Sequence, residues 1–242
     1  IFSGAAPLSV SIMNWYQKID ITIHQAYGMT EDCALSHFNL PGANVVGSVG
    51  ISLPGVTSKL SETGEICIKS NCLMLGYYNK PDETKASFDS EGFLKTGDIG
   101  EYDHDNYLTI TGRIKDQFKT DKGKYIAPTP IEMAFSKNNH IEQICIVGMG
   151  IPQPIALIIL SEKASRLPRE EVCDSLKHDL MRINPSLEKH EKIEKIIIIK
   201  EDWTLDNGLL TPTLKVKRNQ IEKIHKDMYA NWFHQFDNVI FE

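Results

Sequence analysis

The sequence predicts a mixed fold, with an α/β and β-rich segment followed by a compact α+β unit. Strand-like runs separated by turn residues dominate residues 1–113, whereas helical and strand periodicities alternate after residue 115. The charge balance also changes there. Residues 1–113 carry 7 Lys and Arg against 13 Asp and Glu, and residues 114–242 carry 19 of each. We therefore expect a first domain over 1–113, a hinge over 114–119 and a second domain over 120–242.

The first domain is predicted to be rich in short strands. Residues 19–23 alternate apolar and polar side chains, as expected of a half-buried strand, and lead to a turn at Tyr27. Strand-like pieces at 64–70 and 107–111 lie between clusters of Gly, Pro, Asn and Asp, which predicts a small antiparallel sheet or barrel. Residues 81–85 begin with Pro and two acids, so they predict the first turn of a short helix.

The second domain is predicted to alternate helices and strands. Its pattern indicates helices near 130–138, 169–183 and 216–234 and strands near 142–148, 155–161 and 193–200. Residues 148–154, rich in Gly and Pro, predict a hairpin turn whose second strand is the apolar run that follows.

Composition excludes several classes of function. The 242 residues are 41% hydrophobic and carry a net charge of −6, which argues against a nucleic-acid partner. No apolar run approaches the ~20 residues of a membrane span. The five cysteines have no zinc-ligand spacing and an odd count, so we expect reduced, mostly buried thiols in a cytoplasmic protein. The chain begins at Ile1 inside a loop-like segment, and we expect it to be a fragment of a longer chain.

Residues 27–31 (Tyr-Gly-Met-Thr-Glu) carry the parts of a nucleotide and metal site. The ring of Tyr27 can stack on a base, and Gly28 lets the backbone approach a ligand. Thr30 can bind a phosphate oxygen, and Glu31 can hold Mg²⁺, which prefers carboxylate and phosphate oxygens. An ordinary turn with Tyr27 in the core is the alternative interpretation.

Two further motifs are weaker when taken singly. Residues 96–98 (Thr-Gly-Asp) predict a turn whose Asp98 can accept hydrogen bonds from ribose hydroxyls, although most Gly-Asp turns are structural. Residues 112–116 (Gly-Arg-Ile-Lys-Asp) end a strand-like run, so Arg113 can reach a nucleotide while Lys115 lies where the charge balance changes. A simple linker is the alternative there.

Residues 211–218 (Thr-Pro-Thr-Leu-Lys-Val-Lys-Arg) present Lys215 beside further cations, just before the last amphipathic stretch. Such a segment can be a solvated basic turn or can carry a catalytic lysine. By themselves these residues do not decide between the two.

Taken in this order and at these separations, the motifs resemble the adenylate-forming (AMP-binding) superfamily, and most of all its long-chain fatty acid CoA ligases. Residues 2–9, 75–78, 123–128 and 210–218 strengthen the resemblance. It implies the end of the large N-terminal domain, with a strand–loop segment and a small barrel-like subdomain, followed by a mobile α+β lid domain. It also implies that a fatty acid and MgATP form an acyl-adenylate and pyrophosphate, and that the acyl group then passes to coenzyme A.

The resemblance also implies roles for the residues of the first domain. Gly4, Ala5 and Ala6 would line the adenine and acyl pocket. Tyr27 would stack on adenine, with Gly28 beside it in the nucleotide loop.

The phosphate side of the implied site uses charged and hydroxyl groups. Thr30 would bind the α-phosphate, Glu31 would hold Mg²⁺, and Asp98 and Arg113 would bind ribose. Lys215 would be the adenylation lysine, bridging carboxylate and phosphate oxygens and offsetting charge that develops as the carboxylate attacks phosphorus.

In the second half-reaction the lid would rotate about Lys115 and present Gly123 beside the pantetheine tunnel. Relatives usually have Thr-Ser-Gly-Gly-Lys where this chain has residues 120–124, Thr-Asp-Lys-Gly-Lys. The Ser/Thr/Gly-rich loop that cradles the β- and γ-phosphates is absent from the 242 residues, so we expect the isolated fragment to be inactive. Two alternatives stay open, namely an adenylating enzyme with a carrier-protein acceptor and a non-catalytic nucleotide-binding module. The resemblance leaves room for peripheral membrane association.

Overall fold

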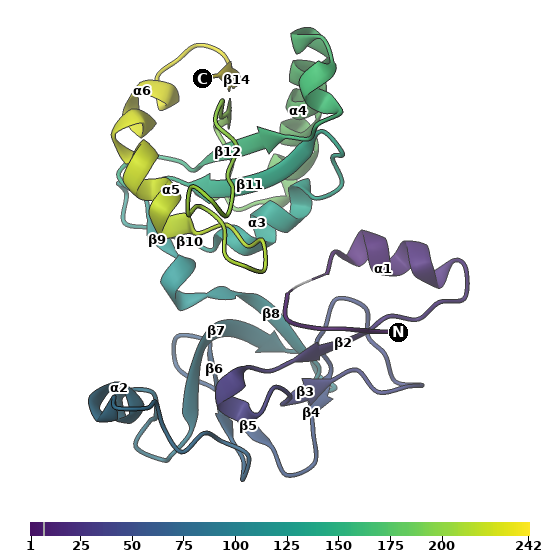
Figure 1. Cartoon of the computed structure of the whole chain (residues 1–242). Coiled ribbons are helices and arrows are strands. Elements are labelled where there is room, and N and C mark those ends of the chain that lie inside the picture. Colours follow the sequence, from purple (N-terminus) through teal and green to yellow (C-terminus); the bar gives the residue numbers. More distant parts are fainter. Residues whose placement is uncertain (7) are drawn as a thin grey trace. The chain divides into compact units, whose positions relative to one another are not determined.

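A computed structural model describes residues 1–6 and 8–242, so Pro7 of the N-terminal motif lies outside the described residues. The chain forms two compact units, Ile1–Lys115 and Asp116–Glu242 (Figure 1). The mixed α/β and α+β fold class predicted from the sequence is confirmed.

A small four-stranded sheet begins the first unit. Its order is β1 (Phe2–Ser3), β2 (His24–Tyr27), β3 (His37–Phe38), β4 (Ile51–Ser52). β1 and β2 pair in parallel, and the other pairs are antiparallel. Helix α1 (Val10–Gln17) connects β1 to β2. Ser9 caps this helix because its side-chain oxygen accepts the backbone N–H of Ile12.

The strand predicted at residues 19–23 is wrong. This segment leaves the end of α1 through backbone hydrogen bonds from Ile19 and Ile21 to the carbonyl of Tyr16. Asp20 has a φ of +57°, which takes the chain out of the extended conformation. The strand starts only at His24, and the alternating isoleucines mark the turn between helix and strand.

A second, antiparallel sheet completes the first unit. Its order is β5 (Thr57–Leu60), β6 (Glu65–Lys69), β7 (Leu94–Tyr102), β8 (Leu108–Arg113). Ile66, Ile68 and Leu108 are fully buried in its core. Both the predicted small antiparallel sheet and the predicted short helix, α2 (Pro81–Ala86), are present.

The turn predicted at residues 96–98 is wrong, because these residues lie inside the nine-residue strand β7. The strand is flanked by β6 and β8, and its register shifts against both neighbours. The N–H of Gly97 donates to the side chain of Glu65 at 2.9 Å. Pairing with two neighbours has overridden the local preference of Gly-Asp for a turn.

The second unit is a sheet with helices on two faces. A hairpin of β9 (Phe118–Lys119) and β10 (Tyr125–Ile126) precedes helix α3 (Pro128–Phe135). The main sheet has the order β11 (Ile141–Val147), β12 (Ile155–Leu160), β13 (Lys195–Ile198), β14 (Val239–Phe241). Its remaining helices are α4 (Arg169–Ile183), α5 (Arg218–His225) and α6 (Tyr229–Phe233).

Alternation along the strands builds two hydrophobic cores. Ile158 and Ile196 face α3 and α4, whereas Leu157 and Ile197 face α5 and α6. In Figure 1 the two helix pairs lie on opposite sides of the sheet. Burial on both faces explains why β12 is continuously apolar.

Several predicted elements of the second unit are confirmed within a few residues, and others differ. The helix predicted at 216–234 is broken into α5, a 3₁₀ turn (Lys226–Met228) and α6. Strand β14 was not predicted. Across both units the five thiols are unpaired, but Cys33 and Cys72 of the first unit are exposed, which corrects the expectation of mostly buried cysteines.

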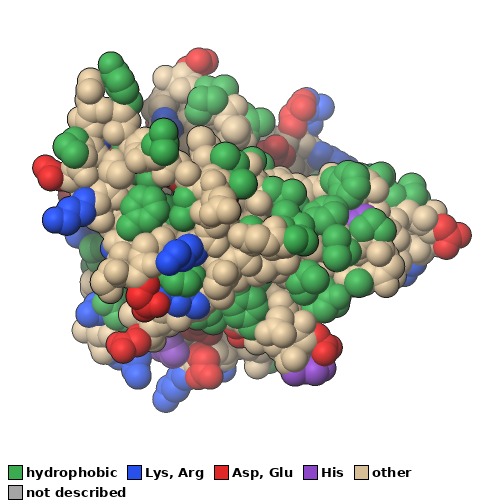
Figure 2. Space-filling model, turned by 90° about the horizontal axis from the view of Figure 1, so that it is seen from below, with side chains coloured by type: hydrophobic (Ala, Val, Ile, Leu, Met, Phe, Trp, Pro, Cys, Tyr) green, Lys and Arg blue, Asp and Glu red, His purple; other side chains and the backbone are tan. Residues whose placement is uncertain are grey.

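The surface carries mixed side chains. Figure 2 shows one face, on which hydrophobic groups are frequent and the Lys and Arg side chains lie scattered among acidic ones. Within residues 1–6 and 8–242, no helix has both the length and the apolar character that a membrane crossing requires.

Truncation of a core leucine tests this packing. Leu176 of α4 is fully buried, so Leu176→Ala should lower the free energy of unfolding by about 2–5 kcal/mol. Met181 of the same helix is 69% exposed, and Met181→Ala should change it by less than about 0.5 kcal/mol. Urea denaturation followed by circular dichroism measures both. Equal effects of the two substitutions would contradict the packing of α4.

Candidate active site

The nucleotide motif, residues 27–31, begins at Tyr27, the last residue of β2, and the chain then folds back on itself. A Cβ at Gly28 would lie 2.3 Å from the carbonyl oxygen of Ala34, so the close approach of the two backbone segments requires glycine there. The N–H of Ala34 donates to the carbonyl of Met29 at 2.7 Å. Thr30 begins a 3₁₀ turn (Thr30–Asp32) and is exposed. The loop is therefore a defined structure that presents Thr30 at its surface.

Tyr27, Asp98 and Arg113, which are far apart in the sequence, meet at one carboxylate. The hydroxyl of Tyr27 donates to Oδ2 of Asp98 at 2.8 Å, and Nε of Arg113 donates to Oδ1 at 2.7 Å. The antiparallel register of β7 and β8 places Asp98 opposite Arg113. Burial, followed by the charge of Asp98, raises the pKa of Tyr27, so its hydroxyl remains a proton donor.

Glu31 has a partner that the sequence interpretation did not identify. The hydroxyl of Tyr77 donates to Oε1 of Glu31 at 2.7 Å. Tyr77 is itself fixed near α2, since its N–H donates to Oγ1 of Thr84 at 2.9 Å. The hydrogen bond to Glu31, followed by burial, raises the pKa of Tyr77. In the sequence, the Tyr-Tyr pair at 77–78 contributes only to the family resemblance, and nothing in the local pattern links it to residue 31.

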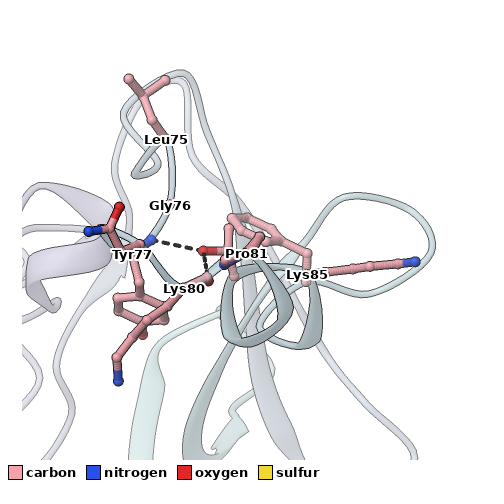
Figure 3. A pocket seen from close by; sticks show the side chains of 9 residues that line it. Leu75, Gly76, Tyr77, Lys80, Pro81 and Lys85 are labelled. Atoms are coloured by element: carbon pink, nitrogen blue, oxygen red, sulfur yellow. Dashed lines mark hydrogen bonds between the residues drawn. The ribbon is translucent and has the colours of Figure 1, made fainter.

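An open hollow of about 450 Å³ lies beside Tyr77 and the start of α2 (Figure 3). Leu75 lies at its edge and is fully exposed, whereas the N–H of Tyr77 donates to the side chain of Thr84. Lys80 and Lys85 also line the hollow. It is too open to enclose a ligand by itself.

Two buried polar residues beside the motif were also missed. Asp32 is 3% exposed, its Oδ1 accepts the N–H of Met29 at 2.8 Å, and burial raises its pKa. His37 lies opposite Tyr27 in the β2–β3 pair and is fully buried. Its Nε2 lies 3.1 Å from the hydroxyls of both Ser52 and Tyr102. Asp32 lies three residues after Met29, but a Met side chain cannot cap a helix, so neither Asp32 nor His37 gives a local signal.

The N-terminal residues lie along the same small sheet. Gly4 follows β1 next to Ala26, since a Cβ at Gly4 would lie 3.6 Å from the carbonyl oxygen of Ala26. Ala5 and Ala6 are exposed in the bend that follows. This segment therefore runs beside the residue that precedes Tyr27.

Lys215 lies at the end of a tight turn in the second unit. The N–H of Thr211 donates to the carbonyl of Lys215 at 2.8 Å, and the N–H of Lys215 donates to Oγ1 of Thr211 at 3.0 Å. Leu214 has a φ of +59°, which closes the turn. The side chain of Lys215 is exposed. A fixed backbone thus presents a long cationic side chain to solvent.

Gly123 belongs to a separate turn. It lies in the β9–β10 hairpin with a φ of +73°, a conformation that favours glycine. The N–H of Gly123 donates to the carbonyl of Thr120 at 3.0 Å. Lys119 and Tyr125 flank the turn, with the ammonium 4.5 Å from the ring centroid. Lys115 is exposed in a 3₁₀ turn (Ile114–Asp116) where the two units adjoin in sequence.

Comparison with known proteins adds family information. The family model described as AMP-binding enzyme matches residues 1–78, which include the N-terminal segment and the nucleotide motif. The model described as AMP-binding enzyme C-terminal domain matches residues 115–237, which include Gly123 and Lys215. Asp98 and Arg113 lie between the two matched segments.

Individual relatives cover nearly the whole chain. Long-chain-fatty-acid CoA ligase 5 of Mus musculus is 30% identical over 98% of this chain and 39% of its own length. A long-chain-fatty-acid CoA ligase of Mycobacterium bovis is 33% identical over 94% of this chain and 41% of its own length. The chain therefore spans about two fifths of the curated relatives that it matches.

Solved structures share the fold. ATP-bound MatB from Rhodopseudomonas palustris has a TM-score of 0.73 at 27% identity, over 94% of this chain and 46% of that one. The adenylation domain of a carboxylate reductase from Mycobacterium chelonae reaches 0.80 at 22% identity, over 97% and 38%. The second likeness shows the fold alone.

The buried His37 predicts a pH dependence of stability. Burial lowers its pKa to about 4, whereas the unfolded chain binds the proton near pH 6.5. Stability contributed by neutral His37 is therefore complete above about pH 6.5 and decreases as the pH falls toward 4. In His37→Gln the urea midpoint should fall less between pH 7 and pH 5 than it does in the unmodified chain.

A matched control is His104→Gln, because the side chain of His104 is 89% exposed. This variant should keep the pH dependence of the unmodified chain. If His37→Gln keeps it as well, another group titrates in this range and the assignment to His37 is wrong.

Proposed function

Because this chain belongs to the AMP-binding enzyme family, we propose that it is the C-terminal part of an ATP-dependent long-chain fatty acyl-CoA ligase. The complete enzyme joins a fatty acid carboxylate to the α-phosphate of ATP and releases pyrophosphate. It then transfers the acyl group from AMP to the thiol of coenzyme A. The names of the relatives from Mus musculus and Mycobacterium bovis support the fatty acid as substrate and coenzyme A as acceptor.

The observation that carries this proposal is the presentation of Lys215. It is an exposed lysine on a turn fixed by hydrogen bonds, inside the segment that matches the C-terminal domain of AMP-binding enzymes. An ammonium group that reaches both the fatty acid carboxylate and the α-phosphate reduces their mutual repulsion. It also stabilises charge that develops in the transition state.

The carboxylate of Asp98 is suited to ribose recognition while it keeps its present partners. Each of its oxygens accepts one hydrogen bond from Tyr27 or Arg113 and retains a second lone pair. The two ribose hydroxyls can use these positions. Arg113 and Tyr27 then orient the carboxylate, and the ring of Tyr27 offers a face for the adenine. Gly4 runs beside Ala26 of β2, and Gly4, Ala5 and Ala6 would line the adenine and acyl pocket.

The residues around Glu31 fit a magnesium ion that is shared with ATP. Glu31 offers a hard carboxylate whose Oε1 accepts a hydrogen bond from the hydroxyl of Tyr77. Within the described part of the chain, no three His, Cys, Asp or Glu side chains are grouped as a metal cage. Mg²⁺ is commonly held by one or two carboxylates together with substrate phosphates, and when bound it would neutralise phosphate charge. Thr30, exposed beside Glu31, donates its hydroxyl to the α-phosphate.

Two half-reactions at one site require the second unit to present two different loops. Lys115 lies at the boundary of the units and acts as the hinge. Rotation about it exchanges the Lys215 turn for the hairpin that holds Gly123. Gly123 has no side chain, which leaves room for the pantetheine arm of coenzyme A.

Removal of the lysine side chain tests the first role. In the complete ligase, Lys215→Ala should lower acyl-adenylate formation by roughly 100-fold or more, because the transition-state charge loses its partner. Thioester formation from supplied acyl-adenylate should change little. Lys217→Ala, two residues further along, is the matched control and should retain adenylation. Equal loss of both half-reactions in Lys215→Ala would contradict the proposed role.

A second prediction concerns the whole protein and the isolated chain. The complete protein should release pyrophosphate from ATP when a long-chain fatty acid is present and should consume coenzyme A in preference to a carrier-protein thiol. The 242-residue chain alone should release none, because it spans two fifths of its relatives and contains no Gly-rich phosphate cradle. Fatty-acid-dependent pyrophosphate release by the isolated chain would refute the second expectation.

A further inference from the structure

Arg218 is the last residue of the segment 211–218, but its environment is the opposite of that of Lys215. Its side chain is only 12% exposed, and that of Glu132 is 17% exposed. Nη2 of Arg218 donates to Oε1 of Glu132 at 2.6 Å. Nη1 donates to the carbonyl oxygen of Ile146 and lies 3.1 Å from Sγ of Cys145. Arg218 is therefore a buried anchor.

This ion pair also completes the backbone hydrogen bonding of an edge strand. β11 lies at one edge of its sheet, so the outward N–H and C=O of Ile146 face no neighbouring strand. Oε1 of Glu132 accepts that N–H at 2.8 Å, and Arg218 donates to that C=O. The two side chains thus supply the hydrogen bonds that a neighbouring strand would make to the N–H and C=O of Ile146. Loss of either leaves a buried backbone group and a buried charge without a partner.

Three segments are joined at this point. Glu132 belongs to α3, Ile146 to β11, and Arg218 is the first residue of α5. In Figure 1, α3, β11 and the start of α5 lie close together within the second unit. Arg218 consequently fixes the start of α5 against the sheet.

The anchor lies three residues after Lys215. The chain entering the turn is held by the buried side chains of Leu209 and Leu210. The chain leaving it is held at Val216, which forms an isolated β-bridge with Leu210, and at Lys217, whose N–H donates to the carbonyl of Leu209 at 2.8 Å. Arg218, whose side chain is 12% exposed, then ties this outgoing side to α3 and β11 through its side chain.

We propose that Arg218 and Glu132 form a positioning pair for Lys215, and that they set where its ammonium lies during adenylation. This inference rests on the proposed function. Neither residue touches the substrates. Their contribution is to hold the outgoing end of the turn and so to fix the position of Lys215. This position matters because a displacement of about 1 Å at a catalytic group can cost roughly 100-fold in rate.

The effect should be confined to one half-reaction because the Gly123 hairpin has its own supports. The N–H of Thr120 donates to the carbonyl of Lys124 at 3.0 Å, and the N–H of Asp121 donates to the carbonyl of Ile151. Phe118 and Ile126 on either side of the turn are buried. Loss of Arg218 removes none of these contacts.

The test measures both half-reactions in the complete ligase. Arg218→Met keeps a long, unbranched side chain. It removes the guanidinium and with it the hydrogen bonds to Glu132, Ile146 and Cys145. Adenylation should fall roughly 10-fold to 100-fold, while thioester formation from supplied acyl-adenylate stays within about threefold. Equal loss in both steps, or no loss in either, would overturn the proposal.

A conservative variant covers the case in which Arg218→Met does not fold. Arg218→Lys keeps the charge but cannot bind Glu132 and Ile146 at once, so it should lose less than Arg218→Met and only in adenylation. Glu132→Gln keeps an acceptor for the N–H of Ile146 and should also give a partial loss. A thioester step that falls in parallel with adenylation in these two variants would again overturn the proposal.

Arg182→Met is the matched control in the same unit. Nη2 of Arg182 donates to Oδ1 of Asp179 at 2.6 Å and to the carbonyl of Ala134 at 3.0 Å, so it too joins a carboxylate and a backbone oxygen. It lies on α4, far along the chain from Lys215. Both half-reactions should persist in this variant, and a loss confined to adenylation would contradict a role specific to Arg218.

Failure of this inference can be distinguished from failure of the proposed function. If the unmodified ligase forms no acyl-adenylate from fatty acid and ATP, the proposed function is wrong. If it does, and the Arg218 variants show no selective loss of adenylation, only the positioning role is wrong.

Discussion

Buried polar groups must find partners inside the protein, and this requirement shapes the loops that carry the candidate site residues. The half-buried nucleotide segment is tied to β7 because the carboxylate of Asp98 accepts from Tyr27 and Arg113. The lysine turn is tied to the sheet of the second unit because Arg218 binds Glu132 and a backbone carbonyl. In both units, residues that are distant in the sequence are brought together by a carboxylate that cannot remain unpaired. Hydrophobic burial makes the cores, and these carboxylates determine where the loops lie.

Much of the second unit could be predicted from the sequence because its elements have strong periodicity. Helix α4 and strand β12 agree with their predicted bounds to within a residue. The first unit was harder, since its strands are short and its decisive contacts are tertiary. Residues 19–23 alternate like a strand but follow the end of α1, and the Gly-Asp pair at 97–98 has turn character but lies inside β7. In both places the environment outweighed the local pattern.

In the candidate site, too, local chemistry could be predicted from the sequence and tertiary contacts could not. Tyr27, Asp98 and Arg113 were identified from their chemistry, and the structure brings these three together. Their mutual hydrogen bonds were not predictable, because they depend on the register of β7 and β8 and on the bend of the nucleotide loop. Glu132 carried no signal at all, since a lone acid in the middle of a helix usually faces solvent. The supporting residues of a site therefore escape a sequence pattern more readily than its principal residues.

The choice of cation at each position follows from burial. Arginine stays charged when it is removed from water, and its planar fork can bind a carboxylate and a carbonyl together, so it suits the interior position 218. Lysine readily loses its charge when it is buried, but it is a compact ammonium on a flexible stem, so it suits the exposed position 215. An exchange of the two residues would leave a weakened anchor inside and a bulkier cation outside. The order of the two cations along the segment thus suits the proposed role of the turn, which is held at Arg218 and presents Lys215 to solvent.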